Sequence, residues 1–478
     1  MKQPRSFPGG VRGALAVLLL VSLALRLVII FRGGEYFWSD ESRYGAAPGA
    51  WDAWIHGHKH QALLLIAGTA DHLGFKVLML LPAWLQIKTG AQVTQPACFV
   101  ALFSVANIFW VWLLARRLGA DEREAFWAAL TMALSASMFY WARHLMPYDL
   151  ALFWALACTY AALKPNSGFL NSWLAGLLGF AAFVTYNGYW SLVACALTAH
   201  VLLAWPGWLE MLKRTFFGLL GLAGTFVLML FVAVHFNIYL VDSYMDFAGT
   251  INQGDFNQGH LVFFDYLWRV EWLTALVWAA ALLAFGWLAV RTDAATRRRG
   301  GLWCATIIVV AVILIVGSNV LGKFVVYGRL ARQVVPFCAL LTGWTAAQLF
   351  RARPPWSRGE CLALALLLAN GAWSLGVPLR QEFPATFHRQ AVAVMQAYRA
   401  QHAPQDPAGT APEKFRFVYN AFIWPAPSEP PVPAGAQTLL AAPHPLAWRP
   451  YLYEGFNRDQ RAKMQATDIT MRLVLLKD

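Results

Sequence analysis

The chain has 478 residues, of which 59% are hydrophobic and only 13% are charged, and its formal net charge is +13. A soluble globular domain carries about 25% charged residues, so this composition excludes a soluble protein, and the mean hydropathy of +0.48 indicates a polytopic membrane protein. The six cysteines fall inside apolar runs, which favours small core residues over a disulfide framework or a metal site. In a membrane protein, the positive charge is expected to mark one side of the membrane, not a nucleic-acid partner.

The N-terminus is basic ("MKQPRSFPGGVRG") and leads into an apolar run at 13–31. No small-residue cleavage site follows, so we expect a retained transmembrane helix instead of a signal peptide. Further runs of roughly 15–21 residues, near the length that spans a bilayer, predict about eleven transmembrane helices in all. These runs lie at 97–115, 124–141, 149–163, 170–186, 189–205, 215–235, 272–291, 302–320, 332–350 and 361–378.

The connections between these runs alternate in charge. The positive-inside rule places the connections with compact Lys/Arg clusters in the cytoplasm, together with the N-terminus. The alternate connections and everything after residue 378 are then expected outside. The cytoplasmic set is "ARRLGADERE", "KPNSG", "PGWLEMLKR", "RTDAATRRRG" and "RARPPWSRGE".

Residues 32–96 form the first outer loop in this arrangement. Its apolar stretch is interrupted by Asp71, His72 and Lys76, so we expect helices lying in or dipping into the outer interface. The alternative is one or two true spans; one extra span would invert the downstream topology and place the Arg-rich connections outside. A second long outer loop, 236–271, has the length of a mobile lid.

The composition changes sharply after residue 378. Residues 379–478 contain a helical pattern ("FHRQAVAVMQAYRAQH"), Pro-rich turns and two strand-like runs, "KFRFVYNAFIW" and "DITMRLVLLKD". These features predict a small outer α/β domain, separate from a membrane catalytic domain at 1–378.

Ionisable residues near a membrane are costly and mark functional sites. Basic groups at an interface suit a lipid phosphate. A carboxylate opposite them would take a proton from an acceptor while the cations stabilise the leaving phosphate. Outside the cytoplasmic clusters and the tail, such residues gather on the outward side: Asp40, Glu41, Arg43, Asp52, Asp71, Lys76, Arg143, Asp149, Lys323, Arg329 and Arg332.

Structural interpretations compete with this functional one. The motif "HGHKH" at 56–60 lacks a clear third and fourth ligand, so no metal site is expected there. The aromatic "TYNGYW" is typical of an interfacial belt, with sugar stacking as the alternative. The other structural alternatives are a helix cap for Asp40 and Glu41, an ion pair closing a helical hairpin for Arg143 and Asp149, and interface anchors for Lys76, Arg329 and Arg332.

Three segments carry a resemblance to a known family. "SDESRYG" resembles the Asp-Glu-x-x-Tyr element in the first outer loop of GT-C glycosyltransferases, which include protein O-mannosyltransferase-like enzymes and lipid A aminoarabinose transferases. "ARHLMPYD" is similar to the family's short Arg and Pro-x-Asp loop, and "GRLARQVVPF" to its late Arg-x-x-x-Pro helix start. The resemblance covers roughly residues 13–350 and implies a GT-C membrane bundle.

The resemblance also implies roles for individual residues. It makes Asp40 the general base that deprotonates the acceptor, and Glu41 a residue that orients the site. Lys76, Arg329 and Arg332 would bind the donor phosphate, with His58, Lys59 and His60 as alternatives to Lys76. The residues implied to bind substrate or brace the site are Arg43, Tyr44, His60, Arg143 and Asp149.

The function implied is transfer of one sugar from a polyprenyl-phosphate donor to an extracytoplasmic glycolipid, polysaccharide or protein, with inversion at the anomeric carbon. No cofactor is expected, because a monophosphate held by Arg and Lys does not require a metal ion. The alternatives are a ligase or polymerase of lipid-linked glycans and, from a different class, a transporter or flippase. Transporters show internal repeats and midplane charges, which are not apparent here. The expected location is a bacterial inner membrane, with the N-terminus in the cytoplasm and the C-terminal domain in the periplasm.

Overall fold

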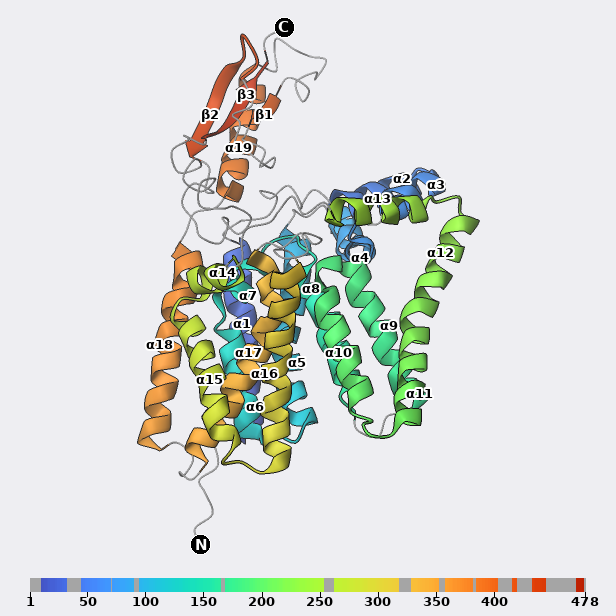
Figure 1. Cartoon of the computed structure of the whole chain (residues 1–478). Coiled ribbons are helices and arrows are strands. Elements are labelled where there is room, and N and C mark those ends of the chain that lie inside the picture. The colour runs from blue at the N-terminus through green and yellow to red at the C-terminus, as the bar shows by residue number, and fades with distance from the viewer. Residues whose placement is uncertain are drawn as a thin grey trace.

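The computed structural model describes most of the chain as helix. Two groups of helices run alongside one another, and a small sheet lies beyond one end of them (Figure 1). The described residues are 10–31, 44–69, 71–89, 94–164, 168–252, 262–317, 328–351, 357–380, 384–402, 415–418, 432–443 and 470–476.

The first half of the chain supplies a helical bundle with short helices at one end. The predicted first outer loop contains α2, α3 and α4 in its described part, as the interrupted apolar pattern indicated. The helices are α1 (Gly10–Phe31), α2 (Ala46–Ile55), α3 (Lys59–Ala67), α4 (Leu73–Thr89), α5 (Thr94–Arg117), α6 (Glu122–Ala133), α7 (Ala136–Trp141), α8 (Tyr148–Ala162), α9 (Phe169–Thr185), the 3-10 turn η2 (Asn187–Tyr189) and α10 (Trp190–Leu202).

The second half continues the bundle. A π-helical segment, η3 (Leu220–Gly224), joins α11 (Trp208–Leu219) to α12 (Thr225–His235). The segment 236–271, predicted as a long loop, instead contains two helices in its described part, α13 (Leu240–Asn252) and α14 (Val262–Glu271). The remaining helices are α15 (Leu273–Ala289), α16 (Ala294–Ile315), the 3-10 helix η5 (Gly328–Val334), α17 (Val335–Phe350) and α18 (Arg358–Arg380).

The apolar runs predicted from the sequence coincide with helices of this bundle. Among the described residues, six helices are long and apolar enough to cross a membrane, and three shorter ones are apolar. The chain is therefore a multi-pass membrane protein. The number of spans, about eleven, stays a prediction.

The bundle has two chemically different ends (Figure 1). We call one the basic end: α1 begins there, and the connections α5–α6, α10–α11, α15–α16 and α17–α18 lie there. Asp121 caps α6 by accepting a hydrogen bond from the Glu124 amide at 2.7 Å, and Asp293 caps α16 through the Thr296 amide at 2.9 Å. We call the other the sheet end, where α2, α3, α13, α14 and the C-terminal sheet lie.

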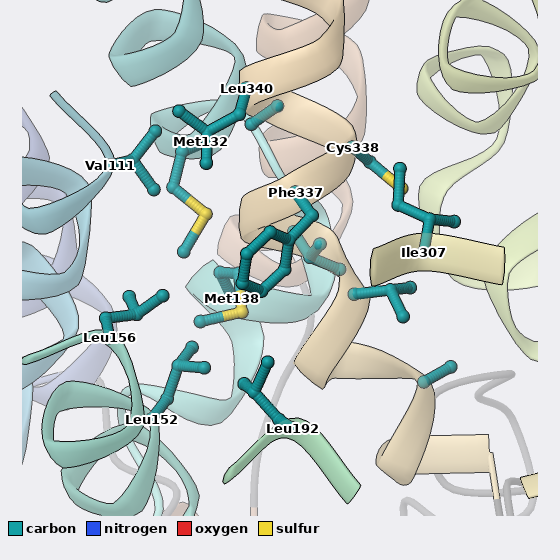
Figure 2. Close-up of a cluster of buried hydrophobic side chains, with 14 of the residues drawn as sticks. Val111, Met132, Met138, Leu152, Leu156, Leu192, Ile307, Phe337, Cys338 and Leu340 are labelled. Carbon is teal, nitrogen blue, oxygen red and sulfur yellow. The ribbon is translucent and has the colours of Figure 1, made fainter. Parts of the chain in front are cut away.

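A tightly packed apolar core fills the bundle below the sheet end. Phe337 of α17 is 1% exposed, and in Figure 2 its ring lies close to Met138. Burying a Phe side chain contributes about 1.5–3 kcal/mol, so these contacts stabilise the position of α17. The neighbours that Figure 2 labels are Val111, Met132, Met138, Leu152, Leu156, Leu192, Ile307, Cys338 and Leu340.

Glycines bring α9 into close contact with α11 and η3. A Cβ atom at Gly176 would lie 2.0 Å from the carbonyl oxygen of Gly218, and one at Gly221 would lie 2.1 Å from that of Trp173. Because backbone atoms cannot move aside, only glycine permits this approach.

The C-terminal region contains α19 (Pro384–His402) and a three-stranded antiparallel sheet in the order β1-β3-β2. The predicted helix and two strands correspond to α19, β1 (Phe415–Val418) and β3 (Thr470–Leu475). The middle strand of the sheet is β3, because Phe415 and Gln437 both pair with Leu475. β2 (Gln437–Pro443) was not predicted. The domain limits 1–378 and 379–478 stay a prediction.

Candidate functional site

A buried ion pair at the sheet end joins two of the predicted site residues. Arg332, at the end of η5, donates a 2.6 Å hydrogen bond from Nη2 to Oδ1 of Asp149, in the first turn of α8. The two side chains are 0% and 1% exposed. A carboxylate at a helix N-terminus also benefits from the helix dipole. Asp149 therefore pairs with Arg332, and the alternative of an Arg143–Asp149 ion pair is wrong.

A second arginine lies beside this pair. Arg26 of α1 is 1% exposed, donates to Ser104 Oγ at 3.0 Å and to the Ser22 carbonyl at 3.1 Å, and lies close enough to sense the charges of Asp149 and Arg332. Among the described residues, two cations thus share one carboxylate, which leaves this part of the buried cluster with an excess positive charge. Arg26 was not predicted as a site residue, because it stands inside an apolar run.

Tyr148 connects the arginines of η5 to a series of aromatic rings. The guanidinium groups of Arg329 and Arg332 lie 5.3 and 5.5 Å from its ring centroid, within cation–π range. The Tyr148 ring lies 4.9 Å from that of Tyr186 and 5.5 Å from that of Trp141. Tyr186 is 4% exposed, so this part of "TYNGYW" belongs to the bundle interior and the interfacial-belt interpretation is wrong for it.

Lys76 lies on α4 and is held by two residues that precede this helix. Its ammonium donates to Asp71 Oδ1 at 3.1 Å and to Thr69 Oγ1, and its side chain is 4% exposed. One turn earlier, the His72 ring lies 5.2 Å from that of Tyr186. The Lys76 side chain is therefore buried against a carboxylate of its own segment, and its two alternative roles, phosphate ligand and interface anchor, both stay predictions.

Arg143 and His144 occupy the turn between α7 and α8. Arg143 donates from Nε to His144 Nε2 at 3.2 Å and lies over the Tyr140 ring at 4.5 Å. Burial, together with the charges of Arg143 and Arg332, lowers the pKa of His144 well below its ordinary value. His144 is therefore neutral near pH 7 and accepts the hydrogen bond from Arg143.

Glu271 holds the start of α7 in place, although sequence reasoning did not single it out. Its carboxylate is fully buried and accepts hydrogen bonds from Ser135 Oγ at 2.6 Å and from the amides of Ala136 and Ser137 at 2.9 and 3.0 Å. It thereby satisfies the first amides of α7. The sequence signal that could have identified Glu271 is its position as a single carboxylate at the start of an apolar run.

Of the remaining predicted site residues, Tyr44 is buried and His60 is exposed. Tyr44 is 1% exposed and donates to Gln86 Oε1 at 2.7 Å, and burial raises its pKa. His60 is exposed on α3 and does not belong to the buried cluster. Asp40, Glu41 and Arg43 lie outside the described residues, so their predicted roles stay predictions.

No group of three or more His, Cys, Asp or Glu side chains suited to a metal ion occurs within the described residues. The donors beside the Tyr148 ring are the guanidinium groups of Arg329 and Arg332, which bind anions and not metal ions. The arrangement thus provides several cations and a wall of aromatic rings, a combination that suits an anionic group attached to an apolar or sugar moiety.

No protein-family model and no curated protein matches the sequence. Solved structures do match. ArnT from Cupriavidus metallidurans, bound to undecaprenyl phosphate, aligns over 84% of this chain and 73% of that one, with 17% identity and a TM-score of 0.50. The apo oligosaccharyltransferase of Archaeoglobus fulgidus aligns over 84% of this chain and 59% of that one, with 12% identity and a TM-score of 0.50. The chain therefore has the fold of these two solved structures, and the GT-C bundle that the sequence resemblance implied is confirmed as a fold.

Proposed function

We propose that the protein is a membrane glycosyltransferase that moves a single sugar from a polyprenyl-phosphate donor to an acceptor outside the cytoplasm. The observation that carries this proposal is the convergence of Arg329 and Arg332 on the ring of Tyr148 at one end of a GT-C bundle. The aromatic contacts continue from Tyr148 to Tyr186 and on to His72, one turn before Lys76 on α4. The undecaprenyl phosphate bound to the structurally similar ArnT supports a lipid phosphate as donor.

The two arginines of η5 differ in how deeply they are buried. Arg332 is fully buried and held by Asp149, whereas Arg329 is 9% exposed above the Tyr148 ring. Arg329 is thus the better placed to contact the phosphate directly, with Arg332 contributing charge from behind. Lys76 would also bind the phosphate, as the resemblance to GT-C enzymes implies. Charge-assisted hydrogen bonds of this kind are worth about 1.5–3 kcal/mol each.

The acceptor would be activated by Asp40, with Glu41 orienting it, as the resemblance to GT-C enzymes implies. Asp40 takes the proton of the acceptor hydroxyl, and the acceptor oxygen attacks the anomeric carbon from the face opposite the phosphate. The bond between that carbon and the phosphate oxygen breaks with inversion, and polyprenyl phosphate leaves with the bonding pair. The arginines stabilise the negative charge that develops on this phosphate, so no metal ion is required.

The proposed topology places the basic end in the cytoplasm of a bacterial inner membrane and the sheet end in the periplasm. The site then faces the compartment in which only lipid-carried sugars are available as donors. Residues 1–378 would form the catalytic membrane domain, residues 379–478 an outer domain, and residues 236–271 a lid over the site.

The experiment that tests the function is mass analysis of envelope glycolipids, polysaccharides and glycoproteins from cells with the native protein or with Asp40→Asn. The expected result is one acceptor that loses the mass of a single sugar in the variant, while folding and undecaprenyl phosphate binding are retained. Loss of a whole glycan would assign the protein to the ligases or polymerases instead. Normal glycosylation by Asp40→Asn would remove Asp40 as the base.

A further inference from the structure

A groove at the basic end lies far from the proposed catalytic site and is not used by it. It has a volume of about 740 Å³ and lies between the ends of α5 and α8 and the facing sides of α10 and α16, which lie side by side (Figure 1). Sites for small ligands typically have volumes of about 300–1,000 Å³. Leu202, Ala305 and Val309 line the groove and are exposed, so it opens sideways from the bundle.

The groove is apolar along its length and basic at its end. The wall from Leu302 to Ile313 on α16 is apolar apart from Thr306, and rises about 16 Å at 1.5 Å per residue. This is close to half of the roughly 30 Å hydrocarbon core of a bilayer, which is the depth of one lipid leaflet. Arg117, Arg298 and Arg299 lie where this wall ends.

The charges of two of these arginines are not neutralised by the described part of the chain. Arg299 is bound by both oxygens of Glu124, at 2.8 and 2.7 Å. Arg117 lies 4.4 Å above the Tyr160 ring, and its buried Nε has no hydrogen-bond partner, while Arg298 is exposed and has no ion pair among the described residues. No acidic side chain lines the groove. The nearby carboxylates are paired elsewhere: Glu122 with Arg12, Glu360 with Arg123 and Asp293 with Arg351.

We propose that this groove binds one anionic glycerophospholipid from the leaflet at the basic end, with its phosphate on Arg117 and Arg298 and its acyl chains along α10 and α16. The buried Nε of Arg117 gains a hydrogen-bond acceptor, and the apolar wall is covered to the depth of one leaflet. Polyprenyl phosphate fits this groove less well, because its phosphate would then lie at the basic end, away from the η5 arginines proposed to bind it. The site links α10 to α16 without taking part in the transfer chemistry.

The test is native mass spectrometry of the purified full chain titrated with phosphatidylglycerol or phosphatidylcholine in detergent. We expect one phosphatidylglycerol per chain, bound at least about tenfold more tightly than phosphatidylcholine, because each basic residue contributes to binding of an anionic headgroup. Arg117→Gln/Arg298→Gln should lose about 30-fold in phosphatidylglycerol affinity. The matched control is Arg297→Gln, which changes an exposed neighbour outside the groove and should keep the native affinity within about twofold.

A second pair of variants keeps the arginines intact. Ala305→Trp fills the groove and should abolish the bound phosphatidylglycerol, whereas Ile308→Trp, on the exposed side of the same helix, should not. Equal binding of the two lipids, or native affinity in Ala305→Trp, would overturn the proposal. Displacement of phosphatidylglycerol by equimolar undecaprenyl phosphate would also overturn it and would assign the groove to the donor lipid.

Discussion

The ion pair of Asp149 and Arg332 allows a sharp test of the charge balance in the buried cluster. Asp149→Asn preserves the shape of the side chain but removes the one carboxylate that the described residues place beside the buried Arg26 and Arg332. Removing one partner of a buried pair costs about 3–5 kcal/mol. Arg332→Met should cost less, because Arg26 still lies close to Asp149.

The double variant Asp149→Asn/Arg332→Met carries the decisive comparison. It leaves one uncompensated arginine instead of two, so we expect it to be more stable than Asp149→Asn alone. The free energy of unfolding would be measured by reversible unfolding in mixed SDS micelles, followed by tryptophan fluorescence. The control is the exposed pair Asp265–Arg269, 2.7 Å apart at the same end, for which Asp265→Asn should cost about 0–1 kcal/mol.

Two results would refute this reasoning. The first is an Asp149→Asn variant no less stable than Asp265→Asn, which would show that the buried carboxylate does not compensate the arginines. The second is a double variant whose loss equals the sum of the two single losses, since additive losses indicate that two residues do not interact.

Three further predictions concern packing, protonation and ligand binding. Gly176→Ala should lower the free energy of unfolding by about 1–3 kcal/mol, because its Cβ would lie 2.0 Å from the Gly218 carbonyl oxygen. The control Gly286→Ala has open space around the new Cβ and should not destabilise the protein. Equal midpoints of thermal unfolding for the two variants would contradict the close packing. Burial raises the pKa of Glu271, so the folded state keeps a proton that the unfolded state releases. The free energy of unfolding therefore falls as pH rises from the ordinary carboxyl pKa through the raised one. Glu271→Gln should remove this slope from unfolding measured between pH 4 and 7, and an unchanged slope would exclude Glu271 as its source. In a titration followed by native mass spectrometry, Arg329→Ala should weaken binding of undecaprenyl phosphate about 10–100-fold. The control Arg269→Ala should leave the affinity unchanged. Unchanged affinity in Arg329→Ala would reassign the phosphate to Arg332 or Lys76.

The sequence predicted the bundle well because long apolar runs have few alternatives in a membrane. It also placed Lys76, Arg143, Asp149 and the arginines of η5 on one side, because charges in so apolar a chain are few. The α13 and α14 helices were missed since their polar, aromatic sequences show no long apolar run. β2 was missed because its short apolar segment lies between proline-rich stretches.

Partners within the site were harder to predict than its members. Asp149 and Arg332 are 183 residues apart, and no sequence spacing relates them. Arg143 and Asp149 lie only six residues apart, which suggested a local pair, but Arg332 of η5 is the partner of Asp149. Arg26 and Glu271 were overlooked because each stands at or inside an apolar segment, where a single charge does not stand out by spacing.

The separation between Asp149 and Arg332 also has a consequence for synthesis. Chains elongate at about 5–20 residues per second, so Arg332 leaves the ribosome roughly 10–40 seconds after Asp149. Arg26, in the first helix, has already emerged by then. The nascent α8 therefore enters the membrane with a cation available for its carboxylate, and the later arrival of η5 completes the pairing.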